Sequence, residues 1–226
     1  MSRRGARALH RRGFTLVELG LVIVVISLLL VAVLQGQSLV GTAGSQAALA
    51  AVKDLATAIA EFRSRYGYLP GDMPTATANV PGVVAGSCSV TANGNGDGTI
   101  DAAEAPCVPE HLFRAGLIKG GYANTTLVVA GVQTAYANAI VLTIAGNTVA
   151  MRALARASSG VTTFSTSTRN VIELINLPCR QAIDLDTKSD DGVFSTGNTR
   201  ASVASCIPTG TTGATNDPVP SIAVAL

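Results

Sequence analysis

The chain has no tryptophan, and aromatic residues make up only 4% of its 226 residues. Charged residues are also scarce, at 13%. Five of the 16 basic side chains lie within the first 13 residues, which leaves 11 basic against 14 acidic side chains in the remainder. The remainder therefore lacks the basic excess of a nucleic-acid-binding surface, and nucleic acid is not an expected partner.

Catalytic motifs are missing as well. There is no Gly-x-Ser-x-Gly sequence, and His111 is the only histidine after residue 13. It lies on an expected amphipathic helix, where packing or exposure explains it. The glycines of Gly94–Gly98 have neither the preceding strand nor the spacing of a nucleotide-binding loop. We therefore do not expect an enzyme.

A basic leader is followed by a membrane-length apolar run. Residues 1–13 carry five arginines and no acid, which predicts that this end stays in the cytoplasm. Residues 14–34 are almost entirely apolar, and a helix over them would be about 31 Å long, enough to cross a bilayer. The sequence therefore predicts a single transmembrane helix that sends the rest of the chain outward.

One carboxylate, Glu18, lies within this apolar run. Ionised in lipid, it would cost about 2.5 kcal/mol or more, so it needs a partner. Cleavage between Gly13 and Phe14 would create an ammonium group about one helical turn away. In a bundle of identical helices, the amine of one chain and Glu18 of its neighbour would neutralise each other and fix the stagger between subunits.

The residues Gly13-Phe14-Thr15-Leu16-Val17-Glu18 resemble the processing site of type IV prepilins and type II secretion pseudopilins. The resemblance implies cleavage after Gly13 by a prepilin peptidase, N-methylation of Phe14, and filament assembly through Glu18. It also implies other pilin or pseudopilin subunits, an inner-membrane assembly platform and membrane lipid as partners. The alternative is an ordinary signal anchor with a glutamate near the interface.

Four segments are expected. They are a leader (1–13), a transmembrane and filament-core helix (14–34), a continuation of that helix (35–67) and a head (68–226). Gln35–Ser38 and Gly41–Gly44 weaken the helix, which resumes from Ser45 with a regular apolar face ending at Tyr66. The turn Tyr66–Asp72 resembles the one that follows the long helix in many pilin-like proteins.

An acidic loop follows. Its oxygen-bearing residues have the spacing of a calcium loop, with Gly98 at the sharp turn. The expected Ca²⁺ ligands are Asn93, Asn95, Asp97, Thr99, Asp101 and Glu104. No helix precedes the loop, and Pro106 shortens the helix that follows it. We therefore expect a structural site with a Ca²⁺ dissociation constant of about 10⁻⁴ to 10⁻³ M. A glycine-rich turn without metal is the alternative.

Four cysteines, Cys88, Cys107, Cys179 and Cys206, allow three pairings, among which the sequence cannot choose. Cys88 and Cys107 flank the acidic loop, and Cys179 and Cys206 flank the C-terminal segment. We therefore favour the local disulfides 88–107 and 179–206. Disulfides suit the periplasm or the cell exterior. Four free thiols are the alternative, and a zinc site is disfavoured because no CxxC pair is present.

The head is expected to combine helices and strands, which makes the fold α+β: a long helix on a small antiparallel sheet, as in pilins. The sequence predicts helices over 109–118 and 169–177 and a meander of strands over 126–132, 138–144 and 148–154. The acids of 182–192 could hold a second cation, but turns are favoured. A strand is expected near 200–206, a loop over 209–216, and an edge strand or frayed tail over 221–226.

These expectations define a minor pilin or pseudopilin of a type IV pilus or type II secretion filament. It would cross the bacterial inner membrane once, with a periplasmic head, and enter a periplasmic or cell-surface filament. A pilus-tip binding module, such as an adhesin or DNA-uptake receptor, is the main alternative. A membrane-anchored hydrolase is a weaker one.

Overall fold

The structure is a computed structural model that describes residues 15–89, 91–129, 131–206 and 218–226. The leader, the Gly13–Phe14 processing site and the predicted loop over 209–216 lie outside these residues. The described chain divides into two compact units, which meet between Val40 and Gly41. Its class is α+β, as predicted.

Helix α1 (Leu16–Tyr66) begins in the first unit and ends in the second. The backbone stays helical through Gln35–Gly44, where the sequence predicts a weak point. Helix propensity costs only about 1 kcal/mol per glycine, which the flanking helical segments can offset. The helix ends where expected, because the N–H of Gly67 bonds to the carbonyl of Arg63 at 2.8 Å and Gly67 has a φ of +80°.

The second unit contains a six-stranded sheet in which every neighbouring pair is antiparallel. The expected antiparallel meander of the first three strands is confirmed, although the predicted first strand, 126–132, runs through the turn into the second strand. In spatial order the strands are β1 (Tyr122–Val129), β2 (Val132–Ile144), β3 (Asn147–Ala155), β4 (Asn170–Leu177), β6 (Val219–Ala225) and β5 (Thr199–Ala201).

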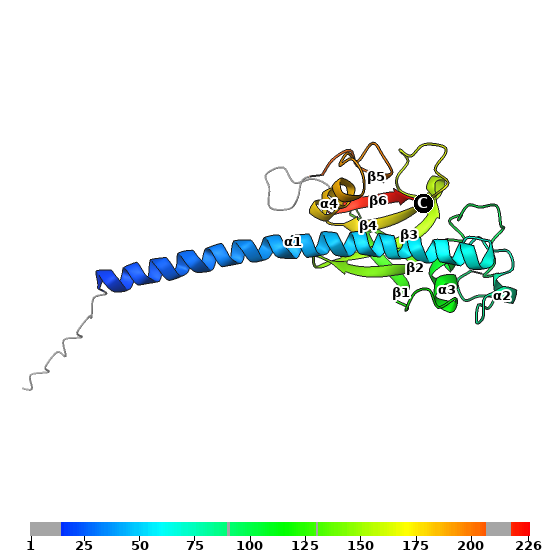
Figure 1. The fold of residues 1–226 in the computed structure, drawn as a ribbon, viewed down its shortest axis with the longest axis horizontal. Coiled ribbons are helices and arrows are strands. Elements are labelled where there is room, and N and C mark those ends of the chain that lie inside the picture. The colour runs from blue at the N-terminus through cyan, green and yellow to red at the C-terminus, as the bar shows by residue number, and fades with distance from the viewer. Residues whose placement is uncertain (1–14, 90, 130, 207–217) are drawn as a thin grey trace, which may run out of the picture. The chain divides into compact units, whose positions relative to one another are not determined.

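The second half of α1 packs across this sheet (Figure 1). The predicted apolar face is confirmed, since Val52, Leu55, Ile59 and Phe62 are buried in the core with strands β2, β3, β4 and β6. Tyr66 is half-buried at the edge of the same cluster. Burial of this apolar face, rather than helix propensity, holds the helix on the sheet.

Short helices complete the head. They are α2 (Ala76–Asn79), α3 (Cys107–Arg114), the 3₁₀ turn η1 (Arg156–Ser158) and α4 (Cys179–Ser189). The helix expected over 109–118 corresponds to α3, which begins two residues earlier and ends before Gly116.

Three sequence predictions in the head are wrong. The helix expected over 169–177 is the strand β4, and the turns expected over 182–192 begin instead as α4. The C-terminal segment forms β6, which is neither an edge strand nor a frayed tail, because it lies between β4 and β5. Each error concerns a segment whose environment is set by distant parts of the chain.

Candidate functional site

Glu18 lies in the first turn of α1, on an apolar segment with exposed side chains. The window Leu16–Val33 has a mean hydropathy of 3.0 and none of it is buried, so by length and composition it could cross a membrane. This indicates a membrane anchor or a signal sequence. The sequence has no Lys, Arg or His over residues 14–52. A cationic partner for Glu18 must therefore come from nearer the amino terminus, from beyond this stretch, or from another molecule.

Thr15 caps this helix. Its Oγ1 accepts a hydrogen bond of 3.2 Å from the N–H of Glu18, and its carbonyl accepts one from Leu19. The Thr-x-x-Glu spacing is that of a capping box, which reasoning from charge alone misses. Glu18 also places negative charge at the positive end of the helix dipole. It therefore has a local structural role in addition to any role in assembly.

The predicted calcium loop is built around Asp72, a carboxylate that sequence reasoning did not single out. Asp72 is 1% exposed. Its Oδ1 accepts hydrogen bonds from the N–H groups of Gly96 and Asp97 at 2.8 and 3.1 Å, and its Oδ2 accepts one from Gly98 at 3.0 Å. Only glycine permits this approach, because a Cβ on Gly94 would lie 2.3 Å from the backbone of Asp72.

Two predicted ligands also bind the loop's backbone. Glu104 accepts hydrogen bonds from the N–H groups of Asn95 and Asp101, at 2.8 and 2.9 Å, one on each carboxylate oxygen. Asp97 accepts one from the N–H of Thr99 at 2.7 Å. Burial raises the pKa of Glu104, whereas hydrogen bonds from Thr99 lower that of Asp97. These acids therefore shape the loop whether or not a metal is bound.

The six predicted ligands share one loop but do not all face one point. Asn93 turns toward α2, where its Oδ1 accepts a hydrogen bond from the N–H of Thr77 at 2.9 Å. Within the described chain, Asp97, Asp101 and Glu104 are not among the sets of three acidic, His or Cys side chains whose ligand atoms lie within 4.8 Å of one another. Calcium at this loop stays a prediction.

The two disulfides are Cys88–Cys107 and Cys179–Cys206, so the favoured local pairing is confirmed. Each bridge closes a segment that contains an aspartate-rich loop. Disulfides persist in oxidising compartments, and this pair indicates that the head lies outside the cytoplasm.

His111 is fully buried on α3 and joins two loops. Its Nδ1 accepts a hydrogen bond from the N–H of Gly71, and its Nε2 donates one to the carbonyl of Ala92, each at 3.0 Å. Burial lowers the pKa of His111, which favours the neutral imidazole. The adjacent sulfurs of Cys88 and Cys107 are joined to each other, which removes them as thiolate ligands.

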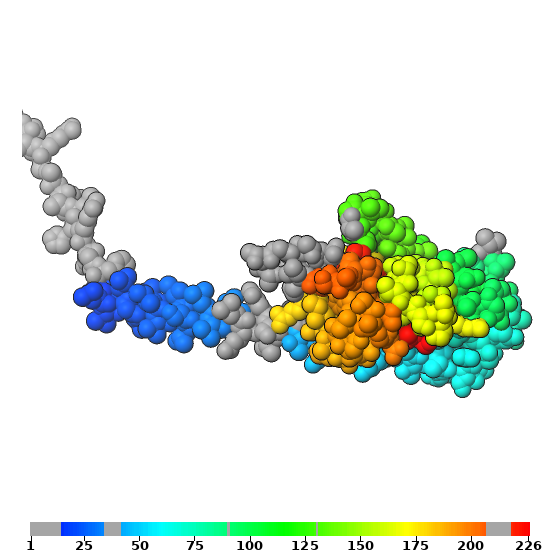
Figure 2. Space-filling model, turned by 90° about the horizontal axis from the view of Figure 1, so that it is seen from above, coloured from blue at the N-terminus to red at the C-terminus, as the bar shows by residue number. Residues whose placement is uncertain are grey.

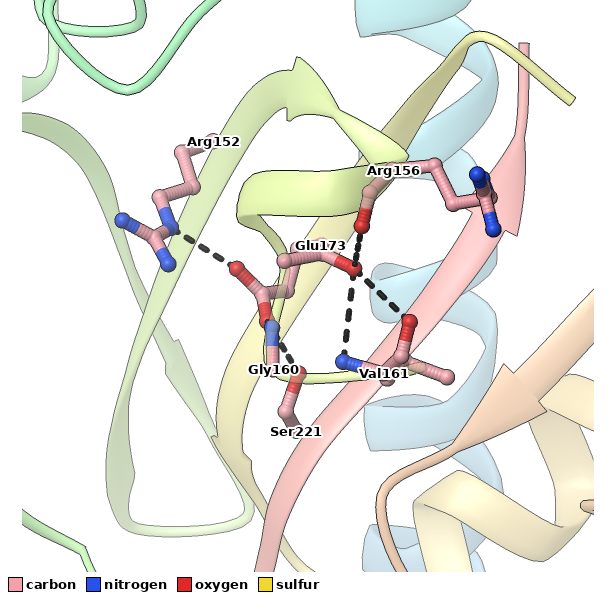
Figure 3. A network of polar contacts seen from close by, with 7 residues as sticks. Arg152, Arg156, Gly160, Val161, Glu173 and Ser221 are labelled. Carbon is pink, nitrogen blue, oxygen red and sulfur yellow. Dashed lines mark hydrogen bonds and ion pairs between the residues drawn. The ribbon is translucent and has the colours of Figure 1, made fainter. Parts of the chain in front are cut away.

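Glu173 anchors a polar network on the sheet (Figure 3). This glutamate on β4 is 1% exposed, and its Oε2 accepts a hydrogen bond of 2.8 Å from Nε of Arg152 on β3. Its Oε1 accepts hydrogen bonds from the N–H of Gly160 at 2.7 Å and from the hydroxyl of Ser221 on β6. The network ties three strands to the β3–β4 connection, and no sequence pattern predicts it.

A second acidic group lies at the C-terminal end of α4. One carboxylate oxygen from each of Asp186, Asp190 and Asp191 lies within 4.8 Å of the others. Asp186 is fully buried, Asp190 is half-buried and Asp191 is exposed. These three carboxylates could hold a cation.

A groove of about 970 Å³ lies between α1 and the predicted calcium loop. Its charged lining includes Arg63, Arg169 and Asp72. The carboxylate of Asp72 already receives the three backbone hydrogen bonds described above. The groove is therefore lined by the guanidinium groups of Arg63 and Arg169 and by the carboxylate of Asp72, which is hydrogen-bonded to the backbone of the loop.

Comparisons of the chain with family models, with curated proteins and with solved structures each found no match. The likeness to prepilins therefore rests on the residues Gly13–Glu18 and on the architecture. That architecture is pilin-like: a long helix with an apolar first part is followed by a head whose antiparallel sheet packs on its second part.

Proposed function

We propose that this protein is a minor pilin or pseudopilin, a structural subunit of a type IV pilus or type II secretion filament. The observation that carries the proposal is the exposed apolar half of α1 with Glu18 in its first turn. Exposed apolar surface of this extent needs lipid or other helices to cover it. A filament supplies the second environment once the subunit leaves the membrane.

The charge pattern supports the same proposal. With no basic residue over 14–52, Glu18 lacks a cation along the apolar helix. The amine of a processed Phe14, within the chain or on a neighbouring subunit, would supply one. Processing would be carried out by a prepilin peptidase at the inner membrane, with the head in the periplasm. The assembly platform and the other subunits are the proposed partners.

Glu18→Gln tests the role of the charge. In a bacterium that carries the assembly genes, the variant should still reach the membrane and form both disulfides in its head. It should be absent from filaments that are sheared from the cells or recovered from the secreted fraction. Thr15→Ala is the matched control, because it removes the helix cap while leaving the carboxylate. Filaments formed equally well with Glu18→Gln would contradict the proposal.

Mass spectrometry of the membrane-extracted chain tests processing separately. The proposal requires an amino terminus at Phe14 carrying one methyl group. A chain that retains residues 1–13 would instead be a tethered ectodomain. Normal filaments that have lost adhesion or DNA uptake after changes in the head would favour the tip-module alternative.

A further inference from the structure

Three carboxylates meet where α4 ends, and their spacing suits one metal ion. An oxygen from each of Asp186, Asp190 and Asp191 lies within 4.8 Å of the others. Ca²⁺ binds oxygen at about 2.4 Å, so ligands around one ion are separated by no more than about 4.8 Å. We propose that Asp186, Asp190 and Asp191 form a Ca²⁺ site that links the end of α4 to the loop preceding β5.

Asp186 provides the independent observation. Its side chain is 0% exposed, and neither Oδ1 nor Oδ2 has a hydrogen-bond partner. By contrast, the buried carboxylates of Asp72 and Glu173 each accept three hydrogen bonds. A buried carboxylate without a partner is costly. Both of its oxygens remain available to a ligand.

The two other acids are held in place by the loop. Oδ2 of Asp190 accepts a hydrogen bond from the N–H of Thr199 at 3.0 Å, at the start of β5. Oδ1 of Asp191 accepts one from the N–H of Val193 at 2.9 Å. Carboxylate oxygens have further lone pairs, so these bonds orient the acids without excluding a metal. The site is therefore held by both the helix and the loop.

The protein supplies little positive charge to this cluster. Within the described chain, no ion pair includes any of the three acids. The guanidinium of Arg200 acts on Asp191 from a distance, but its Nε donates to the carbonyl of Gly197 at 2.9 Å and it lies over the ring of Phe164. A bound cation would neutralise the negative charge of the three carboxylates that Arg200 leaves uncompensated.

The ligand chemistry and location favour calcium. All three groups are hard oxygen donors, which select Ca²⁺ or Mg²⁺ over zinc or copper. The segment between α4 and β5, orange in Figure 2, lies at the surface. Asp191 in this segment is exposed, so water can complete the coordination of the ion. Ca²⁺ accepts such irregular geometry, whereas Mg²⁺ demands a near-ideal octahedron. The disulfide 179–206 encloses the site and limits how far it can open.

Calorimetry on the full-length, chelator-treated chain in detergent tests the site, with CaCl₂ as titrant and MgCl₂ for comparison. We expect a Ca²⁺ dissociation constant of about 10⁻⁴ to 10⁻³ M and a rise in unfolding temperature with added Ca²⁺. Asp186→Asn and Asp191→Asn should weaken binding by at least about tenfold. Asp191 is exposed, so its variant keeps the test valid should Asp186→Asn fold poorly.

Two controls separate this site from other acids. Asp54→Asn removes an exposed carboxylate on α1 and should leave Ca²⁺ binding unchanged. Glu104→Gln removes a ligand of the predicted calcium loop. Loss of binding in Glu104→Gln with full binding in Asp186→Asn and Asp191→Asn would move the metal to that loop and overturn the proposal. Absence of any Ca²⁺ effect on the unmodified chain at about 5 mM would also overturn it.

Discussion

The N–H of Gly98 donates a hydrogen bond of 3.0 Å to Oδ2 of Asp72, and this contact joins the turn after α1 to a loop 26 residues further along the chain. Gly96 and Asp97 bind the other oxygen of the same carboxylate. Converging backbone N–H groups make a pocket for negative charge. The glycine-rich loop is therefore arranged around an internal anion.

Asp72→Ala should destabilise the head by about 2 to 3 kcal/mol, because three backbone N–H groups lose their acceptor in a buried place. Chemical denaturation in the presence of chelator measures the change. Asp54→Ala, at an exposed acid, should change the free energy of unfolding by no more than about 0.5 kcal/mol. Equal stability of both variants would show that the loop does not depend on Asp72.

The Glu173 network gives a second prediction. Glu173→Ala should cost about 3 to 5 kcal/mol, since it leaves Arg152 and the N–H of Gly160 without their buried partner. The exposed pair Glu61–Arg65, at 2.6 Å, is the matched control. Glu61→Ala should cost no more than about 0.5 kcal/mol. A small effect of Glu173→Ala would mean that the network relaxes around its loss.

The sequence predicts the parts of the fold that are locally encoded. The apolar face of α1 repeats every three or four residues, and the strands β1 to β3 follow one another along the chain. Those elements were predicted because their burial pattern is visible within each segment. The capping of α1 by Gly67 is local in the same sense.

Tertiary context decides the elements that were missed. In β4, Val171, Leu174 and Ile175 have helix-like spacing, but the strand lies between β3 and β6 and is buried on both faces. Short apolar runs of this kind do not separate strand from helix by pattern alone. The interior place of β6 follows from β5 pairing beyond it, which no local signal encodes.

The candidate site shows the same division. The spacing of the residues from Asn93 to Glu104 is visible in the sequence, but the intruding carboxylate of Asp72 is not. In the α4 segment, turn-forming residues suggested a solvated loop. Burial of Cys179, Ala182, Leu185 and Asp186 on one helical face reveals the helix and places an acid inside. That placement depends on the sheet beneath.

The disulfides offer a third prediction. Replacing Cys179 and Cys206 together by serine should lower the free energy of unfolding by about 3 kcal/mol, through the greater entropy of the unfolded chain. The separations of 27 and 19 residues differ little, so the Cys88/Cys107 double variant should cost nearly as much. Denaturation of both variants with and without reductant measures this. A reductant effect that persists in either double variant reports the remaining bridge.

His111 should make the head less stable in mild acid. Burial lowers its pKa below the value of about 6.5 in the unfolded chain. Its stabilising contribution is therefore complete above about pH 6.5 and is lost as pH falls toward the folded pKa. The free energy of unfolding, measured from pH 7 to 5, should fall more steeply for the native chain than for His111→Gln. Identical slopes would show that folding does not lower the pKa of His111.

Asp186 should have the opposite pH dependence when no metal is present. Burial, followed by the charges of Asp191 and Asp190, raises its pKa from 3.8 to about 6. Folding then disfavours the ionised form, so in chelator this group lowers stability as pH rises from about 4 to about 6, by up to about 3 kcal/mol. Asp186→Asn should accordingly be more stable than the native chain at pH 8 and gain little at pH 4. Saturating Ca²⁺ should remove the advantage at pH 8, because an ion bound to the ionised carboxylate stabilises only the native chain.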